Sequence, residues 1–163
     1  MRTNRDELKT EYFNYLKEVS YFSKSDKQTD LVLSFCKNII SSILQTKSPH
    51  KLLNINILRM AKYANSDDED NVKLAVYYLS IPPVNIIDWV YEANNIFSES
   101  NDDEDVIEVS QEEILTCIKS KNYVNPFDGN TLTEAQFESM INVVFRVSRK
   151  FIAKYNNEVE HRY

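Results

Sequence analysis

Apolar residues recur at three- and four-residue steps along most of the chain, which is the spacing of a helix that buries one face. Four segments in the first half show it and predict helices over about 6–22, 26–44, 49–65 and 66–80. The apolar stripe of the second segment is the widest, so we expect that helix near the centre of the core. Side chains that can cap helices stand before the second and fourth segments, and Ser48-Pro49 suits the start of the third.

The middle of the chain breaks this pattern at Pro82-Pro83, because proline lacks the amide donor and biases its predecessor away from helical geometry. Residues 84–93 suit either a strand, by their β-branched and aromatic content, or a short helix, by apolar residues at helical steps. Of the two we favour the helix. Val106–Val109 alternates as a strand does, so one short hairpin fits in this region.

The last third predicts two more helices. Ser110 with Glu113 three residues later matches the capping-box pattern and opens a helix through Ile118. Residues 125–130 contain the single glycine of the chain and predict a tight turn. Thr133 then caps a long final helix that extends to about Tyr155.

These elements define a mainly α fold, a compact bundle of about six to seven helices. Residues 84–109 leave room for one short β-hairpin, a winged-helix-like element beside the helices. One glycine and four prolines supply too few turns for a many-stranded sandwich or barrel. A length of 163 residues with 42% hydrophobic residues predicts a single globular domain over 1–163, with a frayed tail at 156–163.

Charge is distributed unevenly along the sequence. The formal net charge is −6, but residues 65–116 contain fourteen acidic residues and a single cation, Lys73, which gives this block −13. Residues 94–105 form its acidic loop. Such a field repels nucleic acid and attracts basic proteins.

Targeting and redox features are few. The most apolar run, Leu31 to Leu44, is interrupted by polar residues, so no membrane-spanning helix is expected, and the charged N-terminus lacks the apolar region of a signal peptide. We therefore expect a cytoplasmic protein. Cys36 and Cys117 each lie among apolar residues and are expected to be buried, reduced thiols.

No motif for catalysis or metal binding emerges. A calcium loop starting at Asp102 would place Val106 at a ligand position and Ile107 where the tight turn needs glycine. His50 and His161 are the only histidines, and neither lies in a segment predicted to hold it firmly. We therefore expect no catalytic residue, no cofactor and no metal site, and a protein that is not an enzyme.

Two hypotheses from different classes remain. In the first, the chain is a non-catalytic acidic interaction module, of the inhibitor, immunity-protein, antitoxin or phage charge-mimic kind, that binds a basic partner such as a nuclease. Its charge and aromatic anchors would come from Asp67, Asp68, Glu69, Asp70, Trp89, Tyr91, Asp102, Asp103, Glu104 and Asp105.

In the alternative, a winged-helix-like regulator contacts DNA phosphates through a basic stripe on the final helix. The stripe consists of Arg146, Arg149, Lys150 and Lys154, and Lys119 and Lys121, which precede that helix in the sequence, would add further phosphate contacts. The pattern favours the acidic module, because the −13 block opposes nucleic acid. Oligomeric state is not decided by any of these features.

Overall fold

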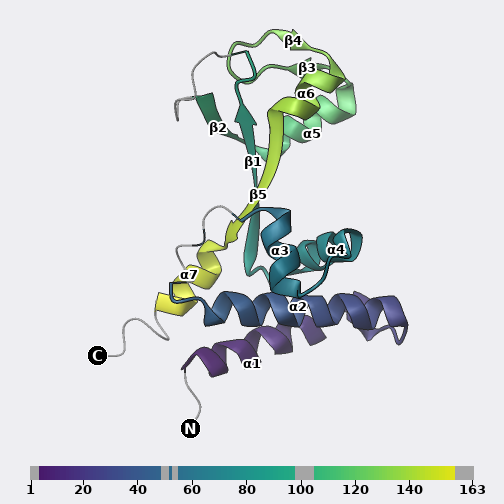
Figure 1. Cartoon of the computed structure of the whole chain (residues 1–163), viewed down its shortest axis with the longest axis vertical. Coiled ribbons are helices and arrows are strands. Elements are labelled where there is room, and N and C mark those ends of the chain that lie inside the picture. The colour runs from purple at the N-terminus through teal and green to yellow at the C-terminus, as the bar shows by residue number, and fades with distance from the viewer. Residues whose placement is uncertain (1–3, 49–51, 53–54, 98–104, 157–163) are drawn as a thin grey trace. The chain divides into compact units, whose positions relative to one another are not determined.

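The computed structural model describes residues 4–48, 52, 55–97 and 105–156, and within them the chain forms seven α-helices, one 3-10 helix and five strands (Figure 1). The helices are α1 (Asn4–Lys17), η1 (Ser20–Ser23), α2 (Lys27–Gln45), α3 (Ile57–Ala64), α4 (Glu69–Leu79), α5 (Gln111–Ser120), α6 (Glu134–Met140) and α7 (Arg149–Tyr155). The strands are β1 (Ile87–Asn94), β2 (Val106–Val109), β3 (Tyr123–Val124), β4 (Thr131–Leu132) and β5 (Ile141–Val147). The prediction of a mainly helical chain with a short hairpin is confirmed at this level, but the fold also contains a three-stranded sheet and is not purely a bundle.

The chain divides into two compact units. Residues 1–88 and 145–163 form the first, which we call the helical unit, and residues 89–144 form the second, which we call the sheet unit. Strands β1 and β5 each begin in one unit and end in the other. The prediction of one globular domain over 1–163 stays a prediction.

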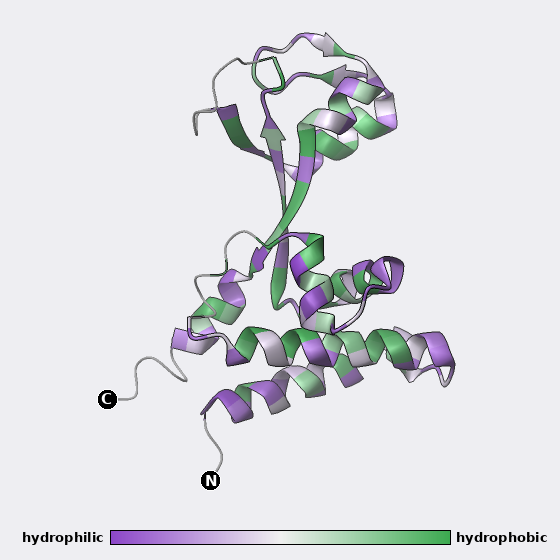
Figure 2. Cartoon of the chain, viewed as in Figure 1, coloured by the Kyte–Doolittle hydropathy of each residue, from purple (hydrophilic) through white to green (hydrophobic). Residues whose placement is uncertain are grey.

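Helix α2 is the centre of the helical unit, as its wide apolar stripe predicts. Asp26 caps it by accepting a hydrogen bond from Thr29 N at 2.8 Å. Figure 2 shows hydrophobic and hydrophilic residues alternating along its ribbon. Its buried residues are Thr29, Val32, Phe35, Cys36, Ile39, Ile40, Ile43 and Leu44.

The C-terminal segment completes the helical unit. Phe145 of β5 exchanges backbone hydrogen bonds of 2.7 and 2.8 Å with Ile55, and Phe151 of α7 packs against Tyr12 of α1. The buried hydroxyl of Ser148 donates to Asn85 O at 2.6 Å and accepts from Phe151 N at 3.0 Å, so this buried polar group is satisfied at the point where β5 ends and α7 begins.

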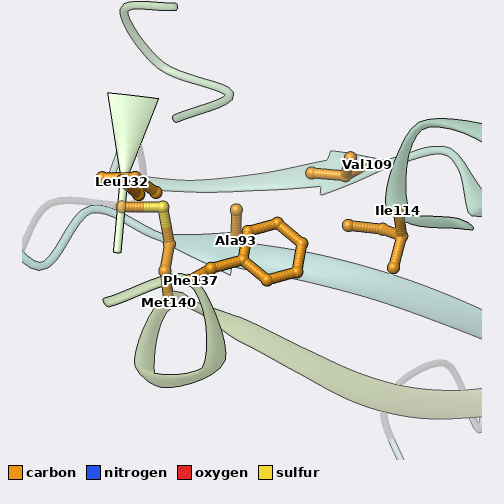
Figure 3. Close-up of a cluster of buried hydrophobic side chains, with 6 residues drawn as sticks. All are labelled: Ala93, Val109, Ile114, Leu132, Phe137 and Met140. Carbon is orange, nitrogen blue, oxygen red and sulfur yellow. The ribbon is translucent and has the colours of Figure 1, made fainter. Parts of the chain in front are cut away.

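The sheet unit is built around a small hydrophobic cluster. Strand β1 pairs with β2 in antiparallel register, with Glu92 opposite Glu108, and the sheet order is β2–β1–β5. Figure 3 shows how side chains from β1, β2, α5, β4 and α6 converge on one another. They are Ala93, Val109, Ile114, Leu132, Phe137 and Met140.

Two predicted helices are wrong. Residues 87–94 form β1 rather than a helix, and residues 141–147 form β5 in the middle of the predicted long final helix. Both segments are rich in β-branched and aromatic residues, whose side chains fit a pleated sheet better than a helical turn. Thr133 does cap a helix, with a full capping box to Gln136, but that helix ends at Met140. Ser148 caps α7 separately.

The start of the third helix is also later than predicted. Helix α3 begins at Ile57, because Asn56 caps it by accepting from Arg59 N at 2.9 Å. The proposed start at Pro49 lies outside the described residues, as do His50, His161 and the tail from 157 onwards. No helix in the described part of the chain is long and apolar enough to cross a membrane.

Candidate functional site

The predicted acidic partner-binding residues fall in both units. Asp67, Asp68, Glu69 and Asp70 lie at the start of α4 in the helical unit. Asp68 caps α4 through Asn71 N, and the other three are exposed. Asp105 lies before β2 in the sheet unit, and its backbone carbonyl accepts from Asn95 N at 2.8 Å. Asp102, Asp103 and Glu104 lie outside the described residues.

The two units have formal charges of opposite sign. Within residues 89–144 the sequence has twelve acidic residues and two cations, Lys119 and Lys121, so the sheet unit has a formal charge of −10. The remaining residues have thirteen acidic and seventeen basic groups, so the helical unit has +4. The negative field is therefore a property of the sheet unit.

A groove of about 320 Å³ opens on the surface of the sheet unit. Its lining residues come from β1, α5, β3, α6 and the first residue of β5. The lining residues are Tyr91, Ile114, Ile118, Tyr123, Glu134, Phe137, Glu138 and Ile141. Most of them are apolar or aromatic, and Ile114 and Phe137 belong to the hydrophobic cluster of Figure 3.

Two carboxylates border this apolar groove. Glu134 and Glu138 are exposed and lie one helical turn apart on α6, so their side chains are neighbours. Loss of hydration raises the pKa of the Tyr123 phenol, and the negative charges of Glu134 and Glu138 raise it further. The Tyr123 ring packs on Phe137 with ring centroids 5.0 Å apart. The groove thus combines an apolar floor with a negative rim.

A second hollow, of about 430 Å³, lies in the helical unit between α3 and the turn before α4. Leu58, which is 69% exposed, lines it together with the predicted residues Asp67 and Glu69. Asn65 and Ser66 supply polar lining. Here too an exposed apolar side chain is a neighbour of carboxylates, but the unit around it is basic overall.

The predicted aromatic anchors Trp89 and Tyr91 both lie in β1. Tyr91 lines the groove of the sheet unit, whereas Trp89 is half-buried and is not among the lining residues. Of the two, Tyr91 is therefore the residue that contributes to the groove.

The predicted basic stripe does not lie on one helix. Arg146 belongs to β5, while Arg149, Lys150 and Lys154 belong to α7, and Lys119 and Lys121 are in the other unit. The stripe at positions 146, 150 and 154 required one continuous helix, which β5 interrupts.

Lys154 is also engaged inside the helical unit. Its ammonium group donates to Glu11 Oε1 and to the Tyr15 hydroxyl. Partial burial alone would raise the pKa of Glu11, but the hydrogen bonds from Lys154 and Tyr15 outweigh it and hold that pKa below its usual value. Burial would lower the pKa of Lys154, and the same contacts raise it instead.

The two cysteines differ in environment. Cys36 is fully buried, and the loss of hydration raises the pKa of its thiol far above the usual value, so it has little thiolate at neutral pH. Cys117 is half-buried beside the cluster of the sheet unit, whereas full burial was expected. Among the described residues, no three His, Cys, Asp or Glu side chains gather closely enough to hold a metal ion.

Sequence reasoning missed the carboxylate rim of the groove, Glu134 and Glu138, and its apolar wall at Ile114 and Ile118. The available signal was the four-residue spacing of the two glutamates on one helix face. No protein-family model, no curated protein and no solved structure matches this chain.

Proposed function

We propose that this chain is a non-catalytic acidic interaction module that binds a basic partner protein through its sheet unit. The observation that carries the proposal is the charge of that unit, −10 over residues 89–144, around an apolar groove. We infer that the module is of the cytoplasmic inhibitor, immunity-protein, antitoxin or phage charge-mimic kind and covers the cationic cleft of a basic partner such as a nuclease.

Charge and apolar surface contribute to different aspects of binding, the first to the rate of encounter and the second to the binding energy. A field of one sign accelerates diffusional encounter with a partner of opposite charge, and this acceleration falls steeply as salt is added. A central desolvated anchor then supplies most of the binding energy. The sheet unit has both features in 56 residues, whereas the exposed cations of the DNA-binding hypothesis are divided between units.

Affinity capture from a lysate of the source cells at low salt, with and without nuclease treatment, tests this proposal. We expect one basic protein that elutes at moderate salt regardless of nuclease. Once it is purified, its association rate should fall steeply with ionic strength. Recovery of nucleic acid alone, lost after nuclease treatment, would contradict the proposal and favour the DNA-binding alternative.

A matched pair of variants assigns the interaction to the sheet unit. Asp102→Lys, Asp103→Lys and Glu104→Lys together change the sheet unit from −10 to −4, and we expect the captured protein to elute at lower salt. Glu7→Lys, Glu18→Lys and Asp30→Lys change the total charge equally in the helical unit and should leave elution nearly unchanged. Equal effects of the two triple variants would show that only net charge matters.

A further inference from the structure

The groove of the sheet unit is small and apolar, and it is large enough to accept one large side chain. Its volume of about 320 Å³ is at the lower end of ligand pockets, which range over about 300–1,000 Å³. Tyr91, Phe137 and Tyr123 supply aromatic surface, and Ile118, 51% exposed, leaves apolar wall in contact with water. Covering that wall with an apolar side chain would release this water and stabilise the complex.

The carboxylates on the rim of the groove determine which groups are favoured beside the apolar side chain of a ligand. Glu134 and Glu138 are separated by one turn of α6, about 5–6 Å between Cβ atoms, and both are exposed. Like charges at this spacing repel each other slightly, and cations placed near them remove that repulsion. Lys119, on α5, is exposed and is not among the lining residues, so the rim faces a ligand without a cation of its own in the lining.

We infer that this groove binds a segment of a basic protein that presents one large apolar side chain flanked by lysine or arginine residues. The apolar side chain enters between α5 and α6, and the flanking cations contact Glu134 and Glu138. This inference rests on the proposed function and adds the binding surface and the chemistry of the partner's segment. Aromatic anchors and arginines are also the residues that dominate binding energy at protein interfaces.

Charge complementarity distinguishes this occupant from a second copy of the chain. A second sheet unit would bring another −10 to a groove whose rim is already negative, and like charges at an interface cost binding energy. A segment with cations on both sides of its anchor removes the repulsion within the rim and gains attraction from the whole unit.

Nuclear magnetic resonance titration of the full chain with defined peptides tests the inference. The probe is the capped peptide Lys-Lys-Trp-Lys-Lys, and its counterpart Lys-Lys-Ala-Lys-Lys has the same charge without the anchor. We expect the tryptophan peptide to shift the amide resonances of Ile118, Tyr123 and Glu138 and to bind about tenfold more tightly than the alanine peptide, because it buries one aromatic side chain.

Two matched pairs of variants separate the groove from its surroundings. Ile118→Asn should abolish the difference between the two peptides, while Leu115→Asn, on the same helix, 49% exposed and outside the lining, should preserve it. Glu134→Gln with Glu138→Gln should weaken both peptides more than Glu112→Gln with Glu113→Gln, which removes the same charge from the first turn of α5.

The outcomes distinguish this inference from the proposed function. If both peptides bind equally and shift resonances over the whole sheet unit, acidic docking stands and the groove inference is wrong. If neither peptide binds even at low salt while affinity capture still recovers a basic protein, the groove inference is wrong and the proposed function stands. If the resonances of the groove shift with protein concentration alone, a second copy occupies it, and the inference is overturned.

Discussion

Tyr12 and Tyr155 are both buried phenols of the helical unit, and their hydroxyl groups have different surroundings. Tyr155 accepts a hydrogen bond of 2.8 Å from the Arg5 guanidinium, which also donates to the carbonyl oxygens of Leu44 and Thr46 at the end of α2. The buried Tyr12 hydroxyl has no hydrogen-bond partner among the described residues. An unsatisfied buried hydroxyl costs folding free energy, whereas a hydrogen bond to a charged group stabilises.

Replacing each tyrosine by phenylalanine should therefore have opposite effects. Tyr155→Phe should lower the free energy of unfolding by about 1–2 kcal/mol, because Arg5 loses an acceptor. Tyr12→Phe should leave it unchanged or raise it by up to about 1 kcal/mol. Urea denaturation followed by circular dichroism measures both, and a larger loss in Tyr12→Phe than in Tyr155→Phe would contradict this reading of the two hydroxyls.

The Glu11–Lys154 pair should make the stability of the helical unit pH-dependent. Because the folded-state pKa of Glu11 is lowered, its contribution is present above the unfolded value of about 4.5 and is lost as pH falls through the folded value. Because the folded-state pKa of Lys154 is raised, its contribution is present below about 10.5 and is lost as pH rises through the folded value.

Glu11→Gln should consequently destabilise the chain by about 0.5–1 kcal/mol at neutral pH, because the pair is partly buried but still screened by solvent. The difference from the wild type should shrink as pH falls below about 4. Denaturation midpoints at several pH values measure this. Glu7→Gln, which replaces an exposed carboxylate on the same helix, is the control for the loss of one negative charge.

Among the helices and strands, the end of α5 shows how one residue can affect the free energy of unfolding. Helix α5 ends at Ser120, and its C-cap residue Lys121 has a left-handed backbone with φ 56°, a conformation that costs a lysine more than a glycine. Lys121→Gly should raise the free energy of unfolding by about 0.5–1 kcal/mol. Lys119→Gly, inside the last turn of the same helix, should lower it by about as much.

Thermal denaturation monitored in the sheet unit distinguishes these two variants. Both replace an exposed lysine with glycine and remove one positive charge, so charge alone predicts the same shift for each. Melting temperatures that shift in opposite directions would confirm that the backbone conformation at each position determines the effect of glycine on stability. Shifts of the same sign would contradict the argument that the left-handed backbone at Lys121 makes glycine stabilising there.

Caps and apolar burial were predictable from sequence, while the choice between helix and strand was not. Asp26, Ser110 and Thr133 cap helices where their side chains predict it, because capping depends on residues within one turn. Phe137 and Phe145 are both buried, yet one lies on a helix and the other on a strand. The spacing of apolar residues in 137–147 fits both, and pairing with other strands decided the matter.

The groove could not be predicted, because its lining is assembled from β1, α5, β3 and α6, and only folding brings these elements together. The acidic block predicts Tyr91 as a binding residue, because its aromatic ring lies within that block. Glu134 and Glu138 lie outside the block, so the charge asymmetry does not point to them. The balance of charged residues in a stretch of sequence predicts the sign of its electrostatic field. A binding site, in contrast, depends on contacts between residues that are distant in sequence.

At the scale of the whole molecule, the charge difference between the units should make their stabilities respond differently to salt. The sheet unit has a formal charge of −10 over 56 residues, and these negative charges repel one another. Because added salt screens this repulsion, it should stabilise the unit and protect its amides from hydrogen exchange. The helical unit, at +4 over a larger number of residues, should respond less.

Hydrogen exchange measured by nuclear magnetic resonance at low and moderate salt tests this difference. Protection should increase for the paired amides of β1 and β2 more than for those in the middle of α2. Glu134→Gln with Glu138→Gln should reduce the salt response of the sheet unit, because it removes two of its negative charges. An equal response in the two units would contradict the self-repulsion argument.

The interruption of the helical unit by residues 89–144 has a consequence for how the protein is made. On the ribosome the sheet unit emerges as one continuous stretch and can acquire its structure as soon as it leaves the exit tunnel. Helix α1 precedes this stretch, but Phe151, which packs against Tyr12, and Tyr155, which accepts a hydrogen bond from Arg5, are translated only after the whole sheet unit. The nascent chain therefore contains α1 without its partners from α7 while the sheet unit is being translated, and in that interval α1 is exposed to chaperones and proteases.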